Sequence, residues 1–461
     1  MATQSPQRAY RAPCPGCGAP VEFASAQSTH AVCSFCLSTV VRQGETLARI
    51  GKMADLFDDH SPLQLFASGR WNKQPFTVVG RMQYRYAGGT WNEWLVRLSG
   101  DTLATLGEDN GAYVMSRPLA AGRELPEAAR FRVGAATAVN GKPYTVASNE
   151  QVTLIGAQGE LPKLPALGKA FAVVELRSAE GEVLSIDYGS TPPELSSGRA
   201  VLLDELQLTG LRHESAKDEK ARQFACPNCG AQVEAALAGS KSITCKACNS
   251  IIDLTQGIGG ELRHAQQHEP VKPVIPLGAV GQLQGVEWQV VGFQHRMGWD
   301  PSEGEDAERF GWDEYLLFNT KRGFTFLVDS EDGWSLVKPV TGAPQWKDGA
   351  TSAKYLGATY AQEWGYQAET TYAAGEFYWQ VERGQRTFNR DFASGKHLLS
   401  REESPREVTW SSGSRIESDL VAKAFRLEGK KELFQRKDAG PTSGSGVGCI
   451  TVIILFVIVL V

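Results

Sequence analysis

The chain has 461 residues, of which 42% are hydrophobic and 21% are charged, and its formal net charge is −5. This length exceeds that of one ordinary domain and indicates three or four domains. The negative charge excludes a general electrostatic attraction to nucleic acid, and the composition is that of a globular protein.

Residues 1–13 are expected to form a loose leader. They contain no apolar stretch of the kind found in secretory signals, so no such signal is predicted. Two CxxC pairs follow, formed by Cys14 and Cys17 and by Cys33 and Cys36. Each CxxC turn holds two thiolates close together, so two turns supply the four sulfurs of a tetrahedral zinc site. We therefore predict that residues 1–41 contain the leader and a first zinc ribbon.

The same cysteine pattern occurs again 212 residues later (226 − 14 = 212 and 245 − 33 = 212), at Cys226, Cys229, Cys245 and Cys248. The glycine after each first pair, Gly18 or Gly230, suits a backbone position with positive φ. The interval between the pairs is expected to form a short β-hairpin, at Pro20–Phe23 in the first copy and Gln232–Ala235 in the second. Residues 213–253 are thus predicted to contain a charged linker and a second ribbon.

Three kinds of chemistry use cysteines in such patterns. Disulfides require an oxidising compartment, and a thioredoxin-like redox site uses one CxxC pair rather than two. Structural zinc is favoured, since four thiolates close the coordination sphere and leave no position for a reacting water. We expect two structural zinc ions, one in each ribbon, and a reducing compartment.

Each ribbon precedes a segment with the pattern of short β-strands, at residues 60–205 and 275–417. Branched and aromatic runs alternate with turn residues about every eight to twelve positions, which favours an all-β sandwich or barrel. The strands expected in the first segment are Phe76–Arg81, Trp91–Leu98, Tyr144–Ala147, Gln151–Ile155, Ala172–Leu176 and Val183–Tyr188. Helical spacing is confined to short pieces, at Glu45–Phe57 and Glu124–Phe131.

The two β segments are copies of one another. Trp288–Gly292 corresponds to Phe76–Gly80, at the same distance from the last ribbon cysteine (80 − 36 = 44 and 292 − 248 = 44). An acidic turn at Asp300–Asp306 carries an insertion in the second copy. The other corresponding stretches are Trp91–Val96 with Trp312–Leu317, Gly159–Pro162 with Gly375–Tyr378, and Ser196–Gly198 with Ser411–Gly413.

This ordered pattern resembles the bacterial family of domain of unknown function 4178. The residues that carry the resemblance are VVGR and WNEW in the first copy, and VVGF, WDEY and GEFYW in the second. The resemblance implies tandem β domains, commonly accompanied by zinc ribbons and membrane segments, and it implies no particular reaction. The first copy departs from the pattern, because Leu161 and Pro162 stand where the second copy has the aromatic cluster Phe377–Trp379.

The end of the chain changes character. Ser418–Phe434 has helical spacing, and a glycine- and serine-rich hinge completes a segment at 418–445. Residues 446–461 carry no charge, and as a helix they would span about 24 Å, short of a hydrocarbon core of about 30 Å. Three interpretations remain open: a short tail anchor, a longer span that is cut off, and a buried strand.

The tail anchor is favoured, because a terminal strand after a flexible hinge would be unusual and the run is longer than ordinary strands. Four basic residues precede the run, namely Lys430, Lys431, Arg436 and Lys437. Positive residues stay on the cytoplasmic side. We therefore expect a single pass through the bacterial inner membrane at residues 446–461, with the bulk of the chain in the cytoplasm.

Other candidate functional residues are carboxylates and tryptophans. Glu93 and Glu314 occupy the same place in both copies, where they could contact a cation or a partner, pair with Arg81 or Arg296, or face water. Eight of the eleven tryptophans lie in the second copy, where they could stack on a ligand or fill the core. These are Trp288, Trp299, Trp312, Trp334, Trp346, Trp364, Trp379 and Trp410.

No GxSxG, Walker, HExxH or dinucleotide-binding motif is present, so no catalytic or organic cofactor-binding residue is predicted. We predict a mainly β fold of two zinc ribbons, each followed by an all-β domain, with a short C-terminal transmembrane helix. The favoured function is a non-enzymatic, membrane-tethered binding or scaffold protein with an unidentified protein partner. The alternative is a nucleic-acid-binding zinc-ribbon protein, which the negative charge disfavours.

Overall fold

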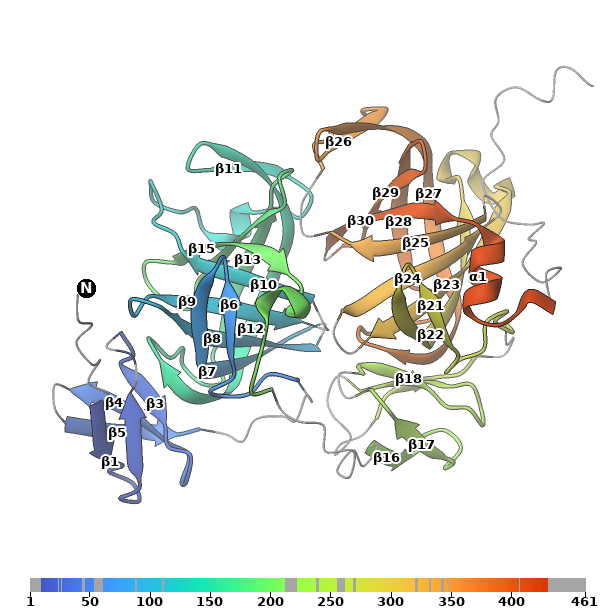
Figure 1. The fold of residues 1–461 in the computed structure, drawn as a ribbon. Coiled ribbons are helices and arrows are strands. Elements are labelled where there is room, and N and C mark those ends of the chain that lie inside the picture. Colours follow the sequence, from blue (N-terminus) through green and yellow to red (C-terminus); the bar gives the residue numbers. More distant parts are fainter. Residues whose placement is uncertain are drawn as a thin grey trace, which may run out of the picture.

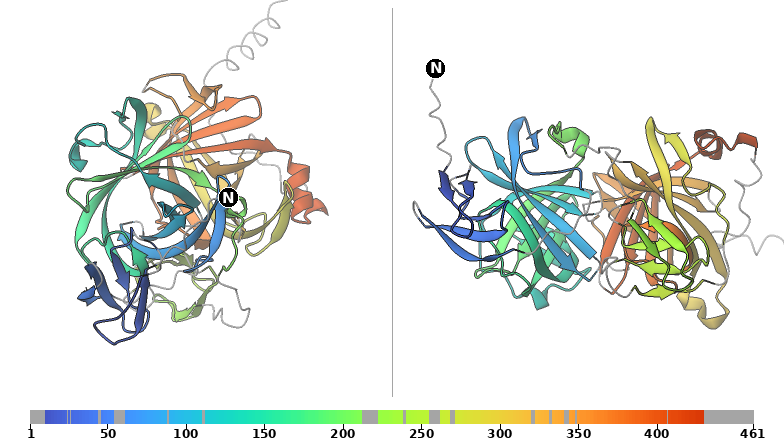
Figure 2. Two further views of the ribbon diagram at one scale, coloured as in Figure 1. Left: turned by 60° about the vertical axis from the view of Figure 1, so that its left-hand side comes forward. Right: turned by 90° about the horizontal axis from the view of Figure 1, so that it is seen from below.

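The computed structural model covers the whole chain, and its described part contains two β-barrels side by side, each with a small cysteine-bearing ribbon (Figure 1). The structure describes residues 10–23, 25, 27–43, 46–53, 61–87, 89–109, 112–211, 222–237, 240–254, 262–267, 271–319, 322–330, 333–340, 344–347, 349–405 and 407–429. Two further views show the barrels adjacent from other directions (Figure 2). The predicted duplication and mainly β fold are confirmed.

Barrel one consists of eight antiparallel strands, and the last pairs with the first to close the wall. Around the barrel these are β7 (Gln74–Tyr86), β8 (Gly89–Leu98), β9 (Leu103–Asp109), β10 (Ala112–Pro118), β15 (Glu194–Val201), β14 (Glu182–Asp187), β13 (Ala170–Arg177) and β12 (Lys142–Leu161). Strands β6 (Ser68–Trp71) and β11 (Ala136–Val139) extend it, and the 3-10 turns are η1 (Ala128–Arg130) and η2 (Leu203–Leu206).

Barrel two repeats this order. Its wall is formed by β22 (Val286–Trp299), β23 (Arg309–Asn319), β24 (Gly323–Ser330), β25 (Gly333–Pro339), β30 (Val408–Ile416), β29 (His397–Glu403), β28 (Arg386–Ser394) and β27 (Ala358–Phe377). Its additional elements are β21 (Val280–Leu283), β26 (Ser352–Tyr355), the 3-10 segment η3 (Pro301–Asp306) and the helix α1 (Ser418–Ala424).

The ribbons are built from short strands that join the barrels. Ribbon one contains β1 (Tyr10–Pro13), β2 (Pro20–Phe23), β3 (His30–Val32), β4 (Ser38–Gln43) and β5 (Thr46–Lys52), and β3 pairs with β12. Ribbon two contains β16 (Arg222–Ala225), β17 (Gln232–Ala235), β18 (Ser242–Thr244), β19 (Ile251–Asp253) and β20 (His264–Ala265), and β18 pairs with β27. Each ribbon therefore continues the sheet of its own barrel.

Large apolar side chains pack on both faces of the barrel walls, and two extensive clusters of barrel one lie outside its wall. On β13, Val174 and Leu176 are buried in an outer cluster, whereas Glu175 and Arg177 line the interior. The alternation arises because successive side chains of a strand point to opposite faces. Covering segments complete the outer clusters, so the barrel interior is only one of the places where apolar side chains are buried.

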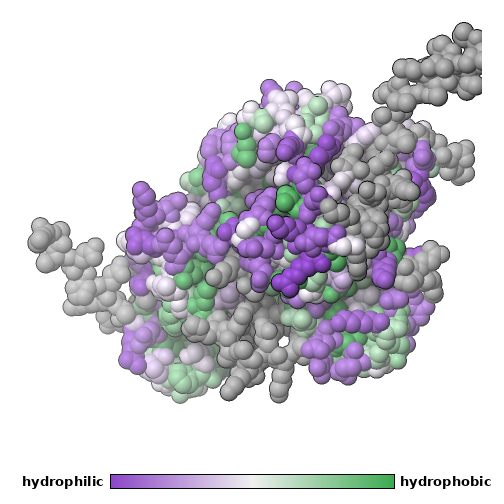
Figure 3. Space-filling model, turned by 45° about the vertical axis from the view of Figure 1, so that its right-hand side comes forward, coloured by the Kyte–Doolittle hydropathy of each residue, from purple (hydrophilic) through white to green (hydrophobic). Residues whose placement is uncertain are grey.

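Barrel two has the same arrangement. Phe293, Tyr315 and Trp334 form an outer cluster with Val421 and Phe425, which belong to the region of α1. The surface seen in Figure 3 is mostly hydrophilic, with apolar residues in small separate areas. The outer clusters are thus largely covered by the chain itself.

Several local predictions were wrong. The connector Glu45–Phe57 was expected to be helical, but its described part contains strand β5, which pairs with β4. The hairpin expected between the cysteine pairs instead surrounds the first pair, because β2 pairs with β1, which includes residues of the expected loose leader. Backbone pairing with an adjacent strand outweighs the weak helical spacing of a short segment.

Other elements differ in extent. Tyr144–Ala147 and Gln151–Ile155 are parts of one strand, β12, which a bulge interrupts after Val146. Helix α1 is shorter than the predicted Ser418–Phe434, and only η1 is helical within Glu124–Phe131. Within the described residues no helix is long and apolar enough to cross a membrane. The predicted anchor at 446–461 lies outside the described residues.

Candidate functional sites: two cysteine clusters and a shared cavity

Each CxxC turn is held by a pair of backbone hydrogen bonds. In the first ribbon, the amide of Cys14 donates to Ala19 and the amide of Gly18 donates back to Cys14, at 2.7 and 2.8 Å. In the second turn, the amide of Leu37 likewise donates back to Cys33. The predicted positive φ is found at Gly18 and also at Gly230, at 78° and 74°. These hydrogen bonds fix the backbone of each turn and so the direction of its cysteine side chains.

The four sulfurs of each set lie within 4.8 Å of one another, in two clusters that could hold metal ions. In ribbon one, the Cys14–Cys36 and Cys17–Cys33 sulfur pairs are both 3.7 Å apart. In ribbon two, the Cys226–Cys248 and Cys229–Cys245 pairs are 3.7 and 3.8 Å apart. A tetrahedral zinc with Zn–S bonds of about 2.3 Å requires sulfurs about 3.8 Å apart. The donor sets therefore fit zinc and are too widely spaced for disulfides.

A serine lies beside one thiol in each cluster. Ser38 Oγ is 3.1 Å from Cys36 Sγ, and this hydrogen bond lowers the pKa of Cys36 to about 6. Ser250 lies 3.3 Å from Cys248 and lowers the pKa of Cys248 to about 5. Since thiolates bind metal, these hydroxyl groups favour the ligating form of Cys36 and Cys248. The pKa of Cys17 and of Cys229 is instead raised to about 12. Backbone hydrogen bonds with Ala19 and Ala231 lower these pKa values, but hydrogen bonds with neighbouring thiols and burial outweigh that effect.

Matching glutamates attach the ribbons to the barrels. The carboxylate of Glu160 on β12 accepts the amide of Ser25 at 3.0 Å. Its counterpart Glu376 on β27 accepts the amides of Ala236 and Leu237 and the hydroxyl of Ser240, at 2.9, 2.8 and 2.6 Å. The glutamate of the repeated Gly-Glu motif thus couples the fold of each ribbon to that of its barrel.

A second candidate site is a cavity of about 1790 Å³ that is lined by interior residues of both barrels. Ligand pockets commonly have volumes of about 300–1,000 Å³, so this cavity is large enough for a small-molecule ligand. Small side chains leave this space open in barrel one, where Thr105, Gly107, Ser116, Ser185 and Ser196 are among the lining residues. An eight-stranded barrel can be filled by its side chains or hold a small ligand, and here the lumen is not filled.

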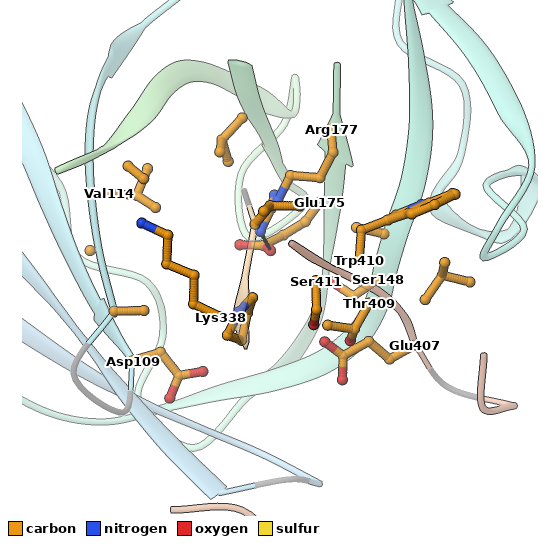
Figure 4. Close-up of a pocket in the computed structure, with 18 of the residues that line it drawn as sticks. Asp109, Val114, Ser148, Glu175, Arg177, Lys338, Glu407, Thr409, Trp410 and Ser411 are labelled. Carbon is orange, nitrogen blue, oxygen red and sulfur yellow. Dashed lines mark hydrogen bonds and ion pairs between the residues drawn. The ribbon is translucent and has the colours of Figure 1, made fainter. Parts of the chain in front are cut away.

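The barrels meet around this cavity. Figure 4 shows Asp109, Glu175 and Arg177 from barrel one and Lys338 and Glu407 from barrel two around one space. An isolated bridge pairs Ser148 with Glu407 across the junction. The cavity therefore depends on the arrangement of both copies.

Ribbon two contributes a cation at the same junction. The ammonium of Lys241 lies 3.3 Å from the Tyr86 hydroxyl, 3.7 Å from an Asp109 carboxylate oxygen and 5.0 Å from the centre of the Tyr86 ring. The Lys241 side chain is only 7% exposed, and burial lowers its pKa while the Asp109 charge opposes that shift. The mouth of barrel one thus already holds one alkylammonium group.

The lumen of barrel two contains a buried arginine between two carboxylates. Nη1 of Arg296 lies 3.1 Å from Glu402 and 3.5 Å from Glu314, and Nη2 donates to Thr387 at 2.6 Å. The guanidinium also lies over the ring of Trp312, with 5.5 Å between the Arg296 carbon and the ring centre. Glu314 therefore pairs with Arg296, which was one of the interpretations left open.

Glu93 does not pair with Arg81. Arg81 lies on the outer face of β7, where it donates to Asn92 and stacks over Trp94. Glu93 faces the lumen, where burial and then the charge of Asp187 raise the pKa of Glu93 to about 7. No ion pair to Glu93 is found in the described part of the chain.

The tryptophans have mixed roles. Trp288, Trp299, Trp312, Trp334 and Trp410 are buried, as the core-packing interpretation predicts. Some of the eight also line the cavity, namely Trp312, Trp334, Trp364, Trp379 and Trp410. The aromatic residues of the second copy therefore contribute both to packing and to the wall of the candidate ligand site.

The sequence reasoning missed Asp187 and Glu402, which lie on corresponding strands and complete the two lumenal carboxylate pairs. Both follow Ser-x in the segments Ser185–Asp187 and Ser400–Glu402. The strand register places Ser185 opposite Ser196 and Ser400 opposite Ser411, which makes the two acidic residues equivalent. A longer alignment of the two copies could have found them.

The two barrels also correspond to a recognised sequence family. A family model for a domain of unknown function (DUF4178) matches residues 67–203 and 276–418, which together make up more than half of the chain. No curated protein and no solved structure matches the chain.

Proposed function

The chain belongs to the DUF4178 family, and we propose that it is a non-enzymatic binding or scaffold protein whose paired barrels enclose a ligand. The observation that carries this proposal is the cavity of about 1790 Å³, which both barrels line. Side chains that line an unfilled space lack packing partners on one side, and a bound ligand would supply some of those contacts.

Zinc has a structural role in this proposal. Four thiolates per site fill a tetrahedral coordination sphere and leave no position for substrate. The ribbons are joined to the barrels by β3–β12 and β18–β27 pairing. Metal binding would therefore stabilise the ends of the longest strands of each barrel.

We further propose that residues 446–461 tether the protein to the bacterial inner membrane, with the barrels in the cytoplasm and a protein partner nearby. The support is the uncharged terminal run and the basic residues before it, such as Lys430 and Arg436. Extraction of the full chain by carbonate without detergent would contradict the tether. Pull-downs with the full chain should recover a membrane-associated protein.

Native mass spectrometry of the full chain, purified in mild detergent, tests the binding role. We expect two zinc ions per chain, together with a small molecule that is lost on denaturation. A protein that purifies empty, and that no compound in a metabolite library stabilises against heat, would contradict the proposal. Nucleic acid binding that falls steeply with salt would support the alternative instead.

A further inference from the structure

The two barrels are internal copies, so their strand registers show which lumenal residues are equivalent. Tyr84 lies opposite Trp91 in barrel one, and Arg296 lies opposite Trp312 in barrel two. Glu93 and Glu314 are two positions further along the neighbouring strands. The register of the serines makes Asp187 and Glu402 equivalent as well.

In barrel two the carboxylate pair is occupied by a cation of the chain itself. The guanidinium of Arg296 lies between Glu314 and Glu402 and over the face of Trp312. The Arg296 residue is 5% exposed, so the charge is held away from bulk water. A buried arginine of this kind is stable only when carboxylates accept its N–H groups.

Barrel one keeps the two carboxylates and the tryptophan but has a different residue in place of the arginine. Tyr84 stands at that position and stacks on Trp91, with ring centres 5.3 Å apart. Glu93 and Asp187 both line the cavity. The carboxylate pair of barrel one therefore lacks the counterpart of Arg296.

Lys163 neutralises this pair only in part. Its ammonium is 3.8 Å from Asp187 but 2.6 Å from Glu194, which lies nearer the surface. The pKa of Asp187 stays raised by burial despite the opposing charge of Lys163, and the pKa of Glu93 is raised for the same main reason. Like charges in a partly buried site favour the binding of a counter-ion.

We propose that the lumen of barrel one binds an organic cation whose guanidinium or ammonium group lies between Glu93 and Asp187, against Trp91. This proposal rests on the proposed binding function and names the chemical class of the ligand. The cationic group lies beside the stacked rings of Tyr84 and Trp91, at the two carboxylates that correspond to the partners of Arg296 in barrel two. Its carbon chain extends along the cavity toward the second barrel.

The walls of the site favour an organic cation over a metal ion. Tyr84 packs against both Trp91 and Phe171 there, and aromatic faces attract ammonium and guanidinium groups. Among the described residues, only the two cysteine sets form groups of three or more metal-ligating side chains. Lys241 is a second example of an organic cation held by an aromatic ring and a carboxylate. Its ammonium contacts Tyr86 and Asp109 at the mouth of the same barrel.

Isothermal titration of the full chain with butylguanidinium tests this inference, with neutral butylurea as the matched probe. We expect wild-type protein to bind butylguanidinium and not butylurea. Glu93→Gln and Asp187→Asn should each weaken binding about tenfold or more, because each removes a charge-assisted hydrogen bond. Glu180→Gln, at an exposed turn outside the cavity, should bind as wild type does.

Tyr84→Arg gives the sharpest comparison, because it would supply barrel one with the guanidinium that barrel two already has. We expect this variant to lose butylguanidinium binding while its folded state is retained. If Tyr84→Arg fails to fold, the comparison of Glu93→Gln with Glu180→Gln decides whether the lumenal carboxylate binds the cation. Absence of binding, equal binding of butylurea, or unchanged binding by both carboxylate variants would overturn the inference.

The cation could come from a free metabolite or from an arginine side chain of a partner. A Gly-Arg-Gly peptide titrated in parallel distinguishes these sources, and we expect the free compound to bind more tightly because the lumen is enclosed by the wall. Native mass spectrometry distinguishes failure of the organic-cation proposal from failure of the proposed binding function. A neutral or anionic occupant would refute the organic cation and leave the binding function intact.

Discussion

Gly80 and Gly159 face each other directly where β7 meets β12 and closes barrel one. A Cβ atom on Gly159 would lie 2.3 Å from the carbonyl oxygen of Val79, and one on Gly80 would lie 2.0 Å from that of Glu160. Gly292 and Gly375 form the same pair in barrel two. The glycines of the repeated VVG and GE motifs are thus required by the close approach of two backbones.

Replacing Gly159 by alanine should therefore destabilise barrel one. Its φ is +74°, which costs a side chain about 1–3 kcal/mol, and the contact with Val79 adds a steric cost. We expect a clear decrease in the unfolding temperature. Chemical denaturation monitored by tryptophan fluorescence measures the change in free energy of unfolding.

Gly141→Ala is the matched control, because Gly141 has φ +77° and a Cβ atom added to it would have no neighbouring atom within 4 Å. It carries the cost of the backbone conformation without the collision. Equal destabilisation by the two substitutions would show that closure does not depend on the glycine pair.

Removal of one zinc ligand should affect its own ribbon. We expect Cys17→Ser to lower the zinc content from two ions to one and to increase hydrogen exchange in β3 and β4, since metal binding stabilises such ribbons. The matching Cys229→Ser variant should increase exchange in β18 and β19. Elemental analysis and hydrogen–deuterium exchange provide the two measurements.

Ser34→Ala changes a residue between the two cysteines of the other turn of ribbon one and serves as the control. A wild-type protein without close to two zinc ions per chain would refute the metal assignment. Exchange that rises equally in both ribbons of the Cys17→Ser variant would refute their independence.

The arginine in barrel two should contribute to stability. Arg296→Met leaves Glu314 and Glu402 without their cation, and we expect a loss of about 2–4 kcal/mol. The estimate lies below that for a fully buried pair, because the Glu402 side chain is 41% exposed. Urea denaturation measures the loss.

Tyr84→Met tests the equivalent position of barrel one, where no ion pair is broken. The loss of stability in Tyr84→Met should come from lost aromatic packing and should not depend on salt. The loss in Arg296→Met should fall slightly at high salt, because one of its partners, the Glu402 side chain, is 41% exposed and open to screening. The opposite pattern would contradict the assignment of charges to the two lumens.

Glu93 should make stability depend on pH. Its pKa is raised to about 7 in the folded chain from an ordinary value of 4.5, so the folded state holds the proton more tightly. Stability from this group is present below pH 4.5 and is lost as the pH rises toward 7, by up to about 1.4 kcal/mol per pH unit. Thermal unfolding across this range measures the effect.

Burial also raises the pKa of Asp109 and Asp187, so these groups too make the folded state less stable as the pH rises. The comparison of wild type with Glu93→Gln isolates the contribution of Glu93. The variant should lose less stability between pH 4.5 and 7, and parallel curves for the two proteins would refute the prediction.

The cysteine clusters could be predicted from the sequence because their geometry is local. A CxxC turn is closed by hydrogen bonds within a few residues, as between Cys14 and Gly18, so spacing alone determines how its sulfurs are presented. The duplication was also predictable, since constant offsets between copies require no knowledge of distant contacts. The strand at Trp91–Leu98 followed from its composition for the same reason.

The closed barrels and the shared cavity were decided only by the tertiary structure. Which face of a strand points into the lumen depends on how the wall closes and on which segments cover its outside, and both involve residues far apart in the chain. Glu93 and Arg81 are both charged residues within strands that pair with each other, yet Glu93 faces the cavity and Arg81 faces an outer cluster. The carboxylate pair of Glu93 and Asp187 exists only because β8 and β14 belong to the same closed wall.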